Sequence, residues 1–295
     1  MDIKNIVAAL LIVPLIGGCG SSPFTESKKS HVVKDFNYKE LLWFAERADA
    51  AYKTKAQIKK LFPKTVRVAE VADTEVQYFL EQHPENSRQV ITIRGTANLK
   101  NVKEDAEYIP SKNKKLGIYV HSGFDDDAMK LYADILPHLN REYKIVVTGH
   151  SLGAAIATLL MMYLHEDGFY VDQSVNFGQP KVTNKKGVKR YGFLPLTRVV
   201  DENDVVPLVP PITLLDSIHG VYEHMGEEVI LLEDVYYVYL EKHNATRKSI
   251  GSFWKNIGRE SVSEHFMANY LKNIQGKKLD SVQVPYNQRE KYIPH

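Results

Sequence analysis

The residues whose types and spacing point most directly to chemistry are 149–153, which read Gly-His-Ser-Leu-Gly. A serine hydroxyl is a poor nucleophile in water. It needs an exposed position, a neighbouring base and N–H groups that face the developing oxyanion. Glycines on both sides of Ser151 allow a strand and a helix to approach closely around a strained serine. The pattern therefore predicts a nucleophile elbow, with the Ser151 hydroxyl held at a sharp turn.

The segments around this turn favour the same interpretation. Residues 143–148 form a short apolar run of the kind found in buried parallel strands, and residues 152–165 are apolar throughout, as a core helix would be. The alternative is a glycine–serine turn without chemistry. The flanking strand and helix favour the elbow over that alternative.

A serine of this kind needs an acid and a histidine that follow it in the chain, on loops at the ends of strands. Three acidic residues follow the apolar run at residues 196–200, namely Asp201, Glu202 and Asp204. Any of the three could orient a histidine, and their spacing does not choose among them.

Strand-like and helix-like patterns alternate along the chain, which is typical of an α/β protein with a mostly parallel sheet. The predicted strands are 66–80 (one strand or a hairpin), 89–94, 143–148, 173–177, 196–200, and an antiparallel pair at 228–232 and 235–240. The predicted helices are 36–53, 126–139, 152–165, 183–191 and 262–274. Residues 97–116 carry many charges and little periodicity, so we expect a mobile flap there.

The composition is that of an ordinary globular protein: 295 residues, of which 44% are hydrophobic and 25% are charged. The formal net charge is only +2, and no basic cluster is interleaved with aromatic residues. These features argue against nucleic acid as a partner. The sequence also has no metal-ligand spacing and no glycine-rich phosphate loop, so no metal or organic cofactor is expected.

The first residues differ from the rest of the chain. Lys4 precedes an apolar run at 6–16 that is too short to span a bilayer and has the size of a signal-peptide core. The run closes with Ile16-Gly17-Gly18-Cys19, which resembles the lipobox of bacterial lipoproteins. We therefore expect residues 1–18 to be a lipoprotein signal peptide. An ordinary cleaved signal with an incidental cysteine is the alternative.

Cys19 is the only cysteine, which suits lipidation and leaves no partner for a disulfide. Residues 19–35 then form a polar tether to a membrane. The protein would be an exported bacterial lipoprotein of the cell envelope. Because Gly20 rather than aspartate follows the cysteine, resemblance to enterobacterial sorting rules favours the outer membrane over the inner one.

Five motifs occur in one order along the chain: Arg94-Gly95-Thr96 with Asn101 and Asp105; Val120-His121-Ser122-Gly123-Phe124; Gly149 to Gly153; Asn176-Phe177-Gly178-Gln179-Pro180-Lys181-Val182; and Asn203-Asp204-Val205-Val206-Pro207 with Pro210 and Pro211. Together they resemble the class 3 lipases, the fungal-type triacylglycerol lipase group within the α/β-hydrolases. The resemblance extends over residues 36–275 and is much more specific than any single motif. It leaves residues 276–295 as an irregular basic tail.

The resemblance implies an α/β-hydrolase fold, with a mostly parallel central sheet flanked by helices and a lid segment. It implies that Ser151 is the nucleophile and Asp204 the catalytic acid, which makes Asp201 and Glu202 ordinary loop residues. His265 lies in a segment similar to the family's catalytic histidine motif. His219 and His224 are its rivals, and His121 and His150 are expected to be hydrogen-bonded structural histidines.

The oxyanion hole is expected to use the N–H of Leu152, the residue after the nucleophile, and the N–H of Thr96. The resemblance implies a serine carboxylic-ester hydrolase, a lipase or esterase that acts on lipid or acyl esters through an acyl-enzyme. No metal and no cofactor are needed.

The expected lid differs from that of fungal lipases. Val102 stands where those enzymes usually have tryptophan, and charged residues follow it. An acidic flap would bind an oil surface poorly, since surface helices need a substantial apolar face. Shorter acyl esters and membrane phospholipids are therefore alternative substrates. A non-catalytic envelope lipoprotein that uses this fold for binding is the alternative from another class. Oligomeric state is not indicated.

Overall fold

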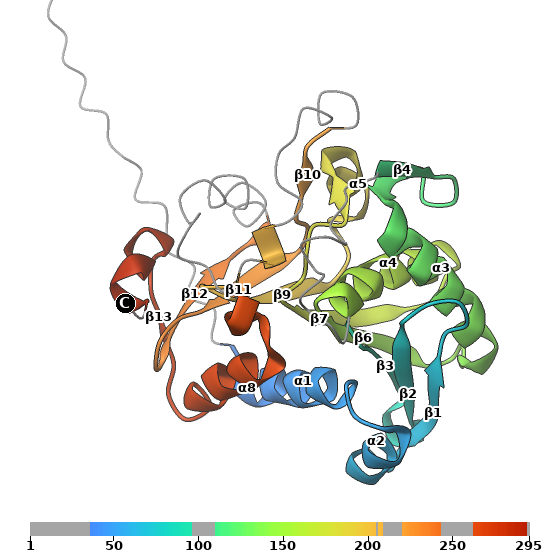
Figure 1. Cartoon of the computed structure of the whole chain (residues 1–295), viewed down its shortest axis with the longest axis horizontal. Coiled ribbons are helices and arrows are strands. Elements are labelled where there is room, and N and C mark those ends of the chain that lie inside the picture. Colours follow the sequence, from blue (N-terminus) through green and yellow to red (C-terminus); the bar gives the residue numbers. More distant parts are fainter. Residues whose placement is uncertain (1–35, 96–109, 205, 209–219, 243–261, 294–295) are drawn as a thin grey trace, which may run out of the picture. The chain divides into compact units, whose positions relative to one another are not determined.

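A nine-stranded sheet lies at the centre of the part of the chain that the computed structural model describes, residues 36–95, 110–204, 206–208, 220–242 and 262–293 (Figure 1). The strand order is β1-β2-β3-β6-β7-β9-β11-β12-β13. The strands are β1 Thr65–Glu70, β2 Gln77–His83, β3 Arg88–Ile93, β6 Lys144–His150, β7 Val171–Phe177, β9 Leu196–Asp201, β11 Glu227–Leu231, β12 Tyr236–Leu240 and β13 Val282–Gln283.

The middle of this sheet is parallel, from β3 through β6, β7 and β9 to β11. The pairs β1–β2, β2–β3 and β11–β12 are antiparallel, so the segment expected as one strand or a hairpin is a hairpin. Because parallel strands place their carboxyl ends at one edge of the sheet, the loops after β6, β7 and β9 lie close together. The mostly parallel α/β sheet is therefore confirmed.

Helices cover both faces of the sheet (Figure 1). On one face α1 (Tyr38–Ala50) and α8 (Met267–Gly276) pack on the central strands, and on the other α3 (Ser122–Ile135) and α4 (Leu152–Glu166) form the larger core cluster. The helix α4 is apolar on all sides and its residues from 153 to 164 are buried. A helix of this composition must lie in the core, so the start of α4 is fixed against β6.

A smaller sheet with strand order β10-β8-β5-β4 lies beside α5 (Lys185–Tyr191). Its strands are β4 Pro110–Asn113, β5 Ile118–His121, β8 Thr183–Asn184 and β10 Tyr222–Glu223. The end of the expected flap, residues 110–116, is therefore a strand and a turn. The prediction was wrong there because it relied on the lack of periodicity. The turn is held by side-chain hydrogen bonds instead: the buried Asn113 amide donates to Asp125 and accepts from the Leu116 N–H. Residues 96–109 of the expected flap lie outside the described residues.

The structure corrects three further expectations: a missed helix, a helix that is divided, and the C-terminal tail. The helix α2 (Lys55–Leu61) was not predicted, because Ile58 is its only buried residue and the segment has no apolar period. The helix expected over 262–274 is a 3₁₀ turn, Val262–His265, followed by α8, because Phe266 is extended. Residues 276–293 are not an irregular tail, since β13 pairs with β12 and Tyr286–Tyr292 forms a 3₁₀ helix.

The other 3₁₀ helices are Pro84–Asn86, Leu136–His138 and Val206–Leu208. Within the described ranges, none of the helices has the length and apolar composition needed to cross a bilayer.

Candidate active site

Ser151 sits at the junction of β6 and α4 with φ 58° and ψ −129°. A non-glycine residue with a positive φ is uncommon, and such backbone strain persists only where the surrounding structure enforces it. Here the Ser151 N–H donates to the Phe177 carbonyl at 3.0 Å, which ties the turn to the end of β7. The Ser151 backbone is therefore strained and anchored, as expected for an elbow.

The two predicted glycines are required by the packing of this turn. A Cβ on Gly149 would overlap the backbone of Gly153, and a Cβ on Gly153 would overlap the backbone of Ile93 and Arg94. The strand β3, the strand β6 and the helix α4 thus meet without side chains between them.

Ser151 is buried in the described structure, with 1% of its surface exposed. The expectation of an exposed serine is therefore wrong for this conformation. The loop that follows β3 accounts for part of the burial, because the Gly95 backbone lies against the Ser151 side chain.

Asp204 and His265 form a buried pair. The His265 Nδ1 lies 2.7 Å from Asp204 Oδ2, and both side chains are fully buried. Because the carboxylate accepts, Nδ1 carries the proton in the neutral imidazole and Nε2 keeps its lone pair. The Nε2 atom is buried and has no hydrogen-bond partner within the described chain. Among the described residues no donor occupies the Nε2 lone pair, so this atom can accept a proton.

Two further donors fix the Asp204 carboxylate. The Tyr270 hydroxyl, on α8, donates to Oδ2 at 2.5 Å, and the Val206 N–H donates to Oδ1 at 2.9 Å. A carboxylate held by three donors in a buried site keeps one orientation. The direction of the His265 ring is set by this arrangement.

Phe177 and Gly178 connect the serine to this pair. Phe177 accepts the Ser151 N–H, and a Cβ on Gly178 would lie 2.7 Å from His265 Cε1 and 2.9 Å from Asp204 Oδ2. Gly178 also has a φ of 55°. The end of β7 thus places the elbow and the Asp204–His265 pair on either side of one short segment.

The rival acids have other partners. Asp201 accepts from the Asn273 amide at 2.5 Å, and Glu202 accepts from Arg289 at 2.7 Å. Neither of these partners is a histidine.

His224, one of the two rival histidines, has a different partner. His224 Nε2 lies 2.7 Å from the Pro207 carbonyl, and burial lowers its pKa well below the usual value. It therefore supports the turn after Asp204 as a neutral donor. His219 lies outside the described residues.

His150 is a neutral structural bridge. Its Nε2 donates to the His265 carbonyl at 2.7 Å, so its Nδ1 accepts from the Tyr52 hydroxyl, also at 2.7 Å. Burial and the neighbouring His265 lower the pKa of His150 well below its usual value. A backbone hydrogen bond from Gly95 reaches Tyr52 as well. The loop after β3 is thereby linked to the backbone of His265.

His121, the other expected structural histidine, stacks on Phe124 with the ring centroids 4.0 Å apart. Burial lowers the pKa of His121 to about 4, so the ring is neutral at pH 7.

The expected oxyanion donors are only partly described. Leu152 is the first residue of α4, and Ser151 makes no side-chain cap there, so the Leu152 N–H has no acceptor within the helix. Thr96 and Cys19 lie outside the described residues. Among the described side chains, no group of three or more His, Cys, Asp and Glu residues is placed to hold a metal ion.

Sequence reasoning missed Tyr52, Gly178 and Tyr270 as members of this site. Tyr270 lies five residues after His265, within the segment that resembles the family's catalytic histidine motif, so its contact with the site could have been predicted. Tyr52 meets His150 across 98 residues of chain, and no local pattern signals that contact.

A mostly parallel sheet with a strained serine between a strand and a helix, and with an Asp–His pair on later loops, defines the α/β-hydrolase class. The comparisons with known proteins agree. The profile of the family described as Lipase (class 3) matches residues 90–214. Residues 90–214 of this chain are therefore similar to the class 3 lipases.

The curated relatives share part of their length with this chain. The lipase of Rhizomucor miehei is 33% identical over 154 residues, which are 47% of this chain and 40% of that protein. Secreted mono- and diacylglycerol lipase 1 of Fusarium solani is 33% identical over 147 residues, which are 43% of this chain and 41% of that protein. The chain thus matches less than half the length of these relatives.

Solved structures share the fold over a larger part of the chain. The lipase of Rhizopus microsporus var. chinensis has a TM-score of 0.62 and 22% identity, over 77% of this chain and 85% of that one. The Lip2 lipase of Yarrowia lipolytica has a TM-score of 0.61 and 20% identity, over 78% of this chain and 93% of that one. At sequence identities of 22% and 20%, the similarity of these structures shows a shared fold.

Replacing Gly178 with alanine is expected to separate His265 from Asp204, because the new Cβ would lie within 3 Å of both side chains. Gly168→Ala is a matched control, since Gly168 also has a positive φ, 77°, but has no atom within 4 Å of an added Cβ. The measurement is the downfield NMR resonance of the imidazole Nδ1–H. We expect Gly178→Ala to lose it and Gly168→Ala to keep it. Retention in both proteins would contradict the described geometry.

Proposed function

We propose that this protein is a serine hydrolase that cleaves carboxylic esters of lipids or other acyl compounds. The observation that carries the proposal is the buried Asp204–His265 pair, whose Nε2 has no partner among the described residues, together with a serine at positive φ that is linked to it through Phe177 and Gly178. The similarity of residues 90–214 to the class 3 lipases supports the same reaction class.

In the proposed reaction the His265 Nε2 accepts the Ser151 proton while Oγ attacks the ester carbonyl carbon. The Asp204 carboxylate holds the Nδ1–H tautomer and stabilises the imidazolium that forms. The protonated imidazole then gives its proton to the leaving alcohol, which leaves an acyl-serine. Water, deprotonated by the same Nε2, attacks the acyl carbon and releases the carboxylic acid. These steps need neither a metal ion nor an organic cofactor.

The oxyanion of each tetrahedral intermediate would be stabilised by the N–H groups of Leu152 and Thr96. Each such donor contributes about 3 kcal/mol to the transition state. Leu152 supports this assignment because its N–H opens a core helix whose dipole also favours negative charge. The His150–Tyr52 bridge to Gly95 supports it from the other side, because Gly95 directly precedes Thr96.

The substrate class that we propose is lipid or acyl esters. Relatives are called lipases and mono- and diacylglycerol lipases, which supports a glyceride or a simpler acyl ester. The polar sequence at 102–107 favours shorter or membrane-presented esters over an oil phase. A phospholipase activity and a non-catalytic binding role are the alternatives.

We expect the purified protein to hydrolyse p-nitrophenyl esters, tested with acyl chains from two to sixteen carbons. Ser151→Ala should lower the rate by several orders of magnitude, because the nucleophile is removed while the fold keeps a small side chain. His265→Ala should lose about as much, whereas His224→Ala should lose less. Full activity of Ser151→Ala would rule out the mechanism. No turnover by the parent protein would favour phospholipids or the binding role.

We further propose that the protein is an exported lipoprotein anchored through Cys19, on the strength of the lipobox-like sequence at residues 16–19. Acyl chains on Cys19 would hold the hydrolase near membrane lipids, by about 0.8 kcal/mol for each buried CH₂ group. Expression in a bacterium with an alkyne-tagged palmitate should label the parent protein and not Cys19→Ser. Equal labelling of both, or of neither, would contradict the anchor.

A further inference from the structure

The C-terminal segment, residues 277–293, is attached to the outer strands of the main sheet. The Val282 and Val284 N–H groups donate to the carbonyls of Val235 and Tyr237, both at 2.8 Å. Val284 is buried in a separate apolar cluster whose other buried members are Ile230, Leu232, Val238 and Leu240. This segment is therefore a fixed part of the domain, and it can hold the side chains that it contacts in place.

Arg289 of this segment contacts the loop of residues 201–204, here called the acid loop because it ends at Asp204. Its guanidinium lies 3.9 Å from the centre of the Tyr286 ring and donates to the Tyr286 carbonyl at 3.1 Å. Its Nε donates to Glu202 Oε1 at 2.7 Å, and the two side chains are only 7% and 10% exposed. A buried charged pair of this kind is strongly disturbed when one partner is removed.

Glu202 depends on that partner. Burial raises the pKa of Glu202 to about 7, Arg289 opposes the rise, and the carboxylates of Glu228 and Asp201 add to it. Without Arg289, Glu202 would have to take up a proton or move toward water. Either change acts on a residue only two positions before Asp204.

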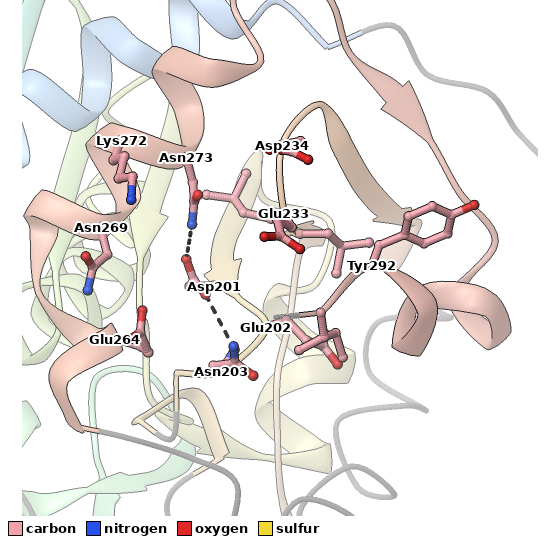
Figure 2. A pocket seen from close by; sticks show the side chains of 13 residues that line it. Asp201, Glu202, Asn203, Glu233, Asp234, Glu264, Asn269, Lys272, Asn273 and Tyr292 are labelled. Carbon is pink, nitrogen blue, oxygen red and sulfur yellow. Dashed lines mark hydrogen bonds between the residues drawn. The ribbon is translucent and has the colours of Figure 1, made fainter. Parts of the chain in front are cut away.

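The acid loop borders a cavity on this side. A cavity of about 360 Å³ lies beside Asp201, Glu202 and Asn203, and Tyr292 of the C-terminal segment lines it as well (Figure 2). Buried polar side chains beside the cavity keep hydrogen-bond partners. Asn273 holds Asp201, as Figure 2 shows, and Arg289 holds Glu202.

Hydrogen bonds within the acid loop couple the position of Glu202 to that of Asp204. The Asp204 N–H donates to the Asp201 carbonyl at 3.0 Å, and the Glu202 N–H donates to the Leu231 carbonyl at 3.2 Å. The Asp201 N–H donates to the Tyr270 hydroxyl, which in turn donates to Asp204. A shift of Glu202 would therefore change the orientation of the Asp204 carboxylate.

We infer that Arg289 is a positioning residue for the proposed hydrolysis, through which the C-terminal segment holds Glu202 and thereby the catalytic acid Asp204. This inference rests on the proposed function of Ser151, Asp204 and His265. Arg289 touches no reacting atom and sets the orientation of the acid from outside the site.

The chain offers a closely matched control. Arg47 pairs with buried Glu81 at 2.8 Å, lies over the Trp43 ring and donates to the Trp43 carbonyl at 3.1 Å. Its contacts thus have the same types as those of Arg289, but they join α1 to β2. Loss of this pair should affect stability without moving the acid loop.

The test compares Arg289→Gln, Arg289→Lys, Glu202→Gln and Arg47→Gln in the full chain, at a temperature where each is folded by circular dichroism. Arg289→Gln and Glu202→Gln should each lower kcat for a p-nitrophenyl ester about ten- to a hundred-fold with KM nearly unchanged. They should also shift or broaden the downfield Nδ1–H resonance. The double variant should lose no more than either single variant. Arg289→Lys should recover part of the rate, and Arg47→Gln should keep the parent kcat and resonance.

Two outcomes would overturn the inference. In the first, Arg289→Gln has the kcat and resonance of Arg47→Gln. In the second, the losses of Arg289→Gln and Glu202→Gln add in the double variant. Failure of the proposed function is distinguishable from both, because it would leave Ser151→Ala as active as the parent. If Arg289→Gln does not fold, Glu202→Gln, which removes the same ion pair from the loop side, decides the question by the same two measurements.

Discussion

The strained backbone of Ser151 is the constraint on which the rest of the site depends. At this strained turn β6 and α4 approach so closely that no side chain fits between them, which explains Gly149 and Gly153. The backbone conformation also directs the Ser151 N–H to Phe177, so that the end of β7 becomes part of the turn. Gly178, the next residue, lies against His265 and Asp204. The position of the pair thus follows from the geometry of the elbow.

A second principle governs the surroundings: each polar group that is buried here needs a partner. Asp204 receives three donors, and the His265 carbonyl receives one from His150. His150 in turn accepts from Tyr52, near the end of α1. Side chains from the turn after α1, from β6, from the loop after β9, from the 3₁₀ helix Val262–His265 and from α8 are therefore joined in one hydrogen-bonded set. Such a set has one satisfied arrangement, which gives the site its preorganisation.

The sequence predicted the parts of the structure that depend on local patterns. The elbow, the central strands and α4 could be predicted because apolar runs and glycine spacing specify them directly. The choice of Asp204 and His265 needed the family resemblance, since spacing alone could not separate Asp204 from Asp201 and Glu202. The contacts of Tyr52, Arg289 and the C-terminal segment could not be predicted, because they join residues distant in the chain. The burial of Ser151 was also missed, as it depends on how separate loops pack together.

The most direct test of the account is covalent labelling with a lipid-like fluorophosphonate, followed by mass spectrometry of the digested protein. The account predicts one adduct for each protein molecule, on the peptide that contains Ser151, with labelling much slower in His265→Ala and absent after heat unfolding. An adduct on another serine, or equal labelling of the folded and unfolded proteins, would contradict the claim that this fold activates Ser151.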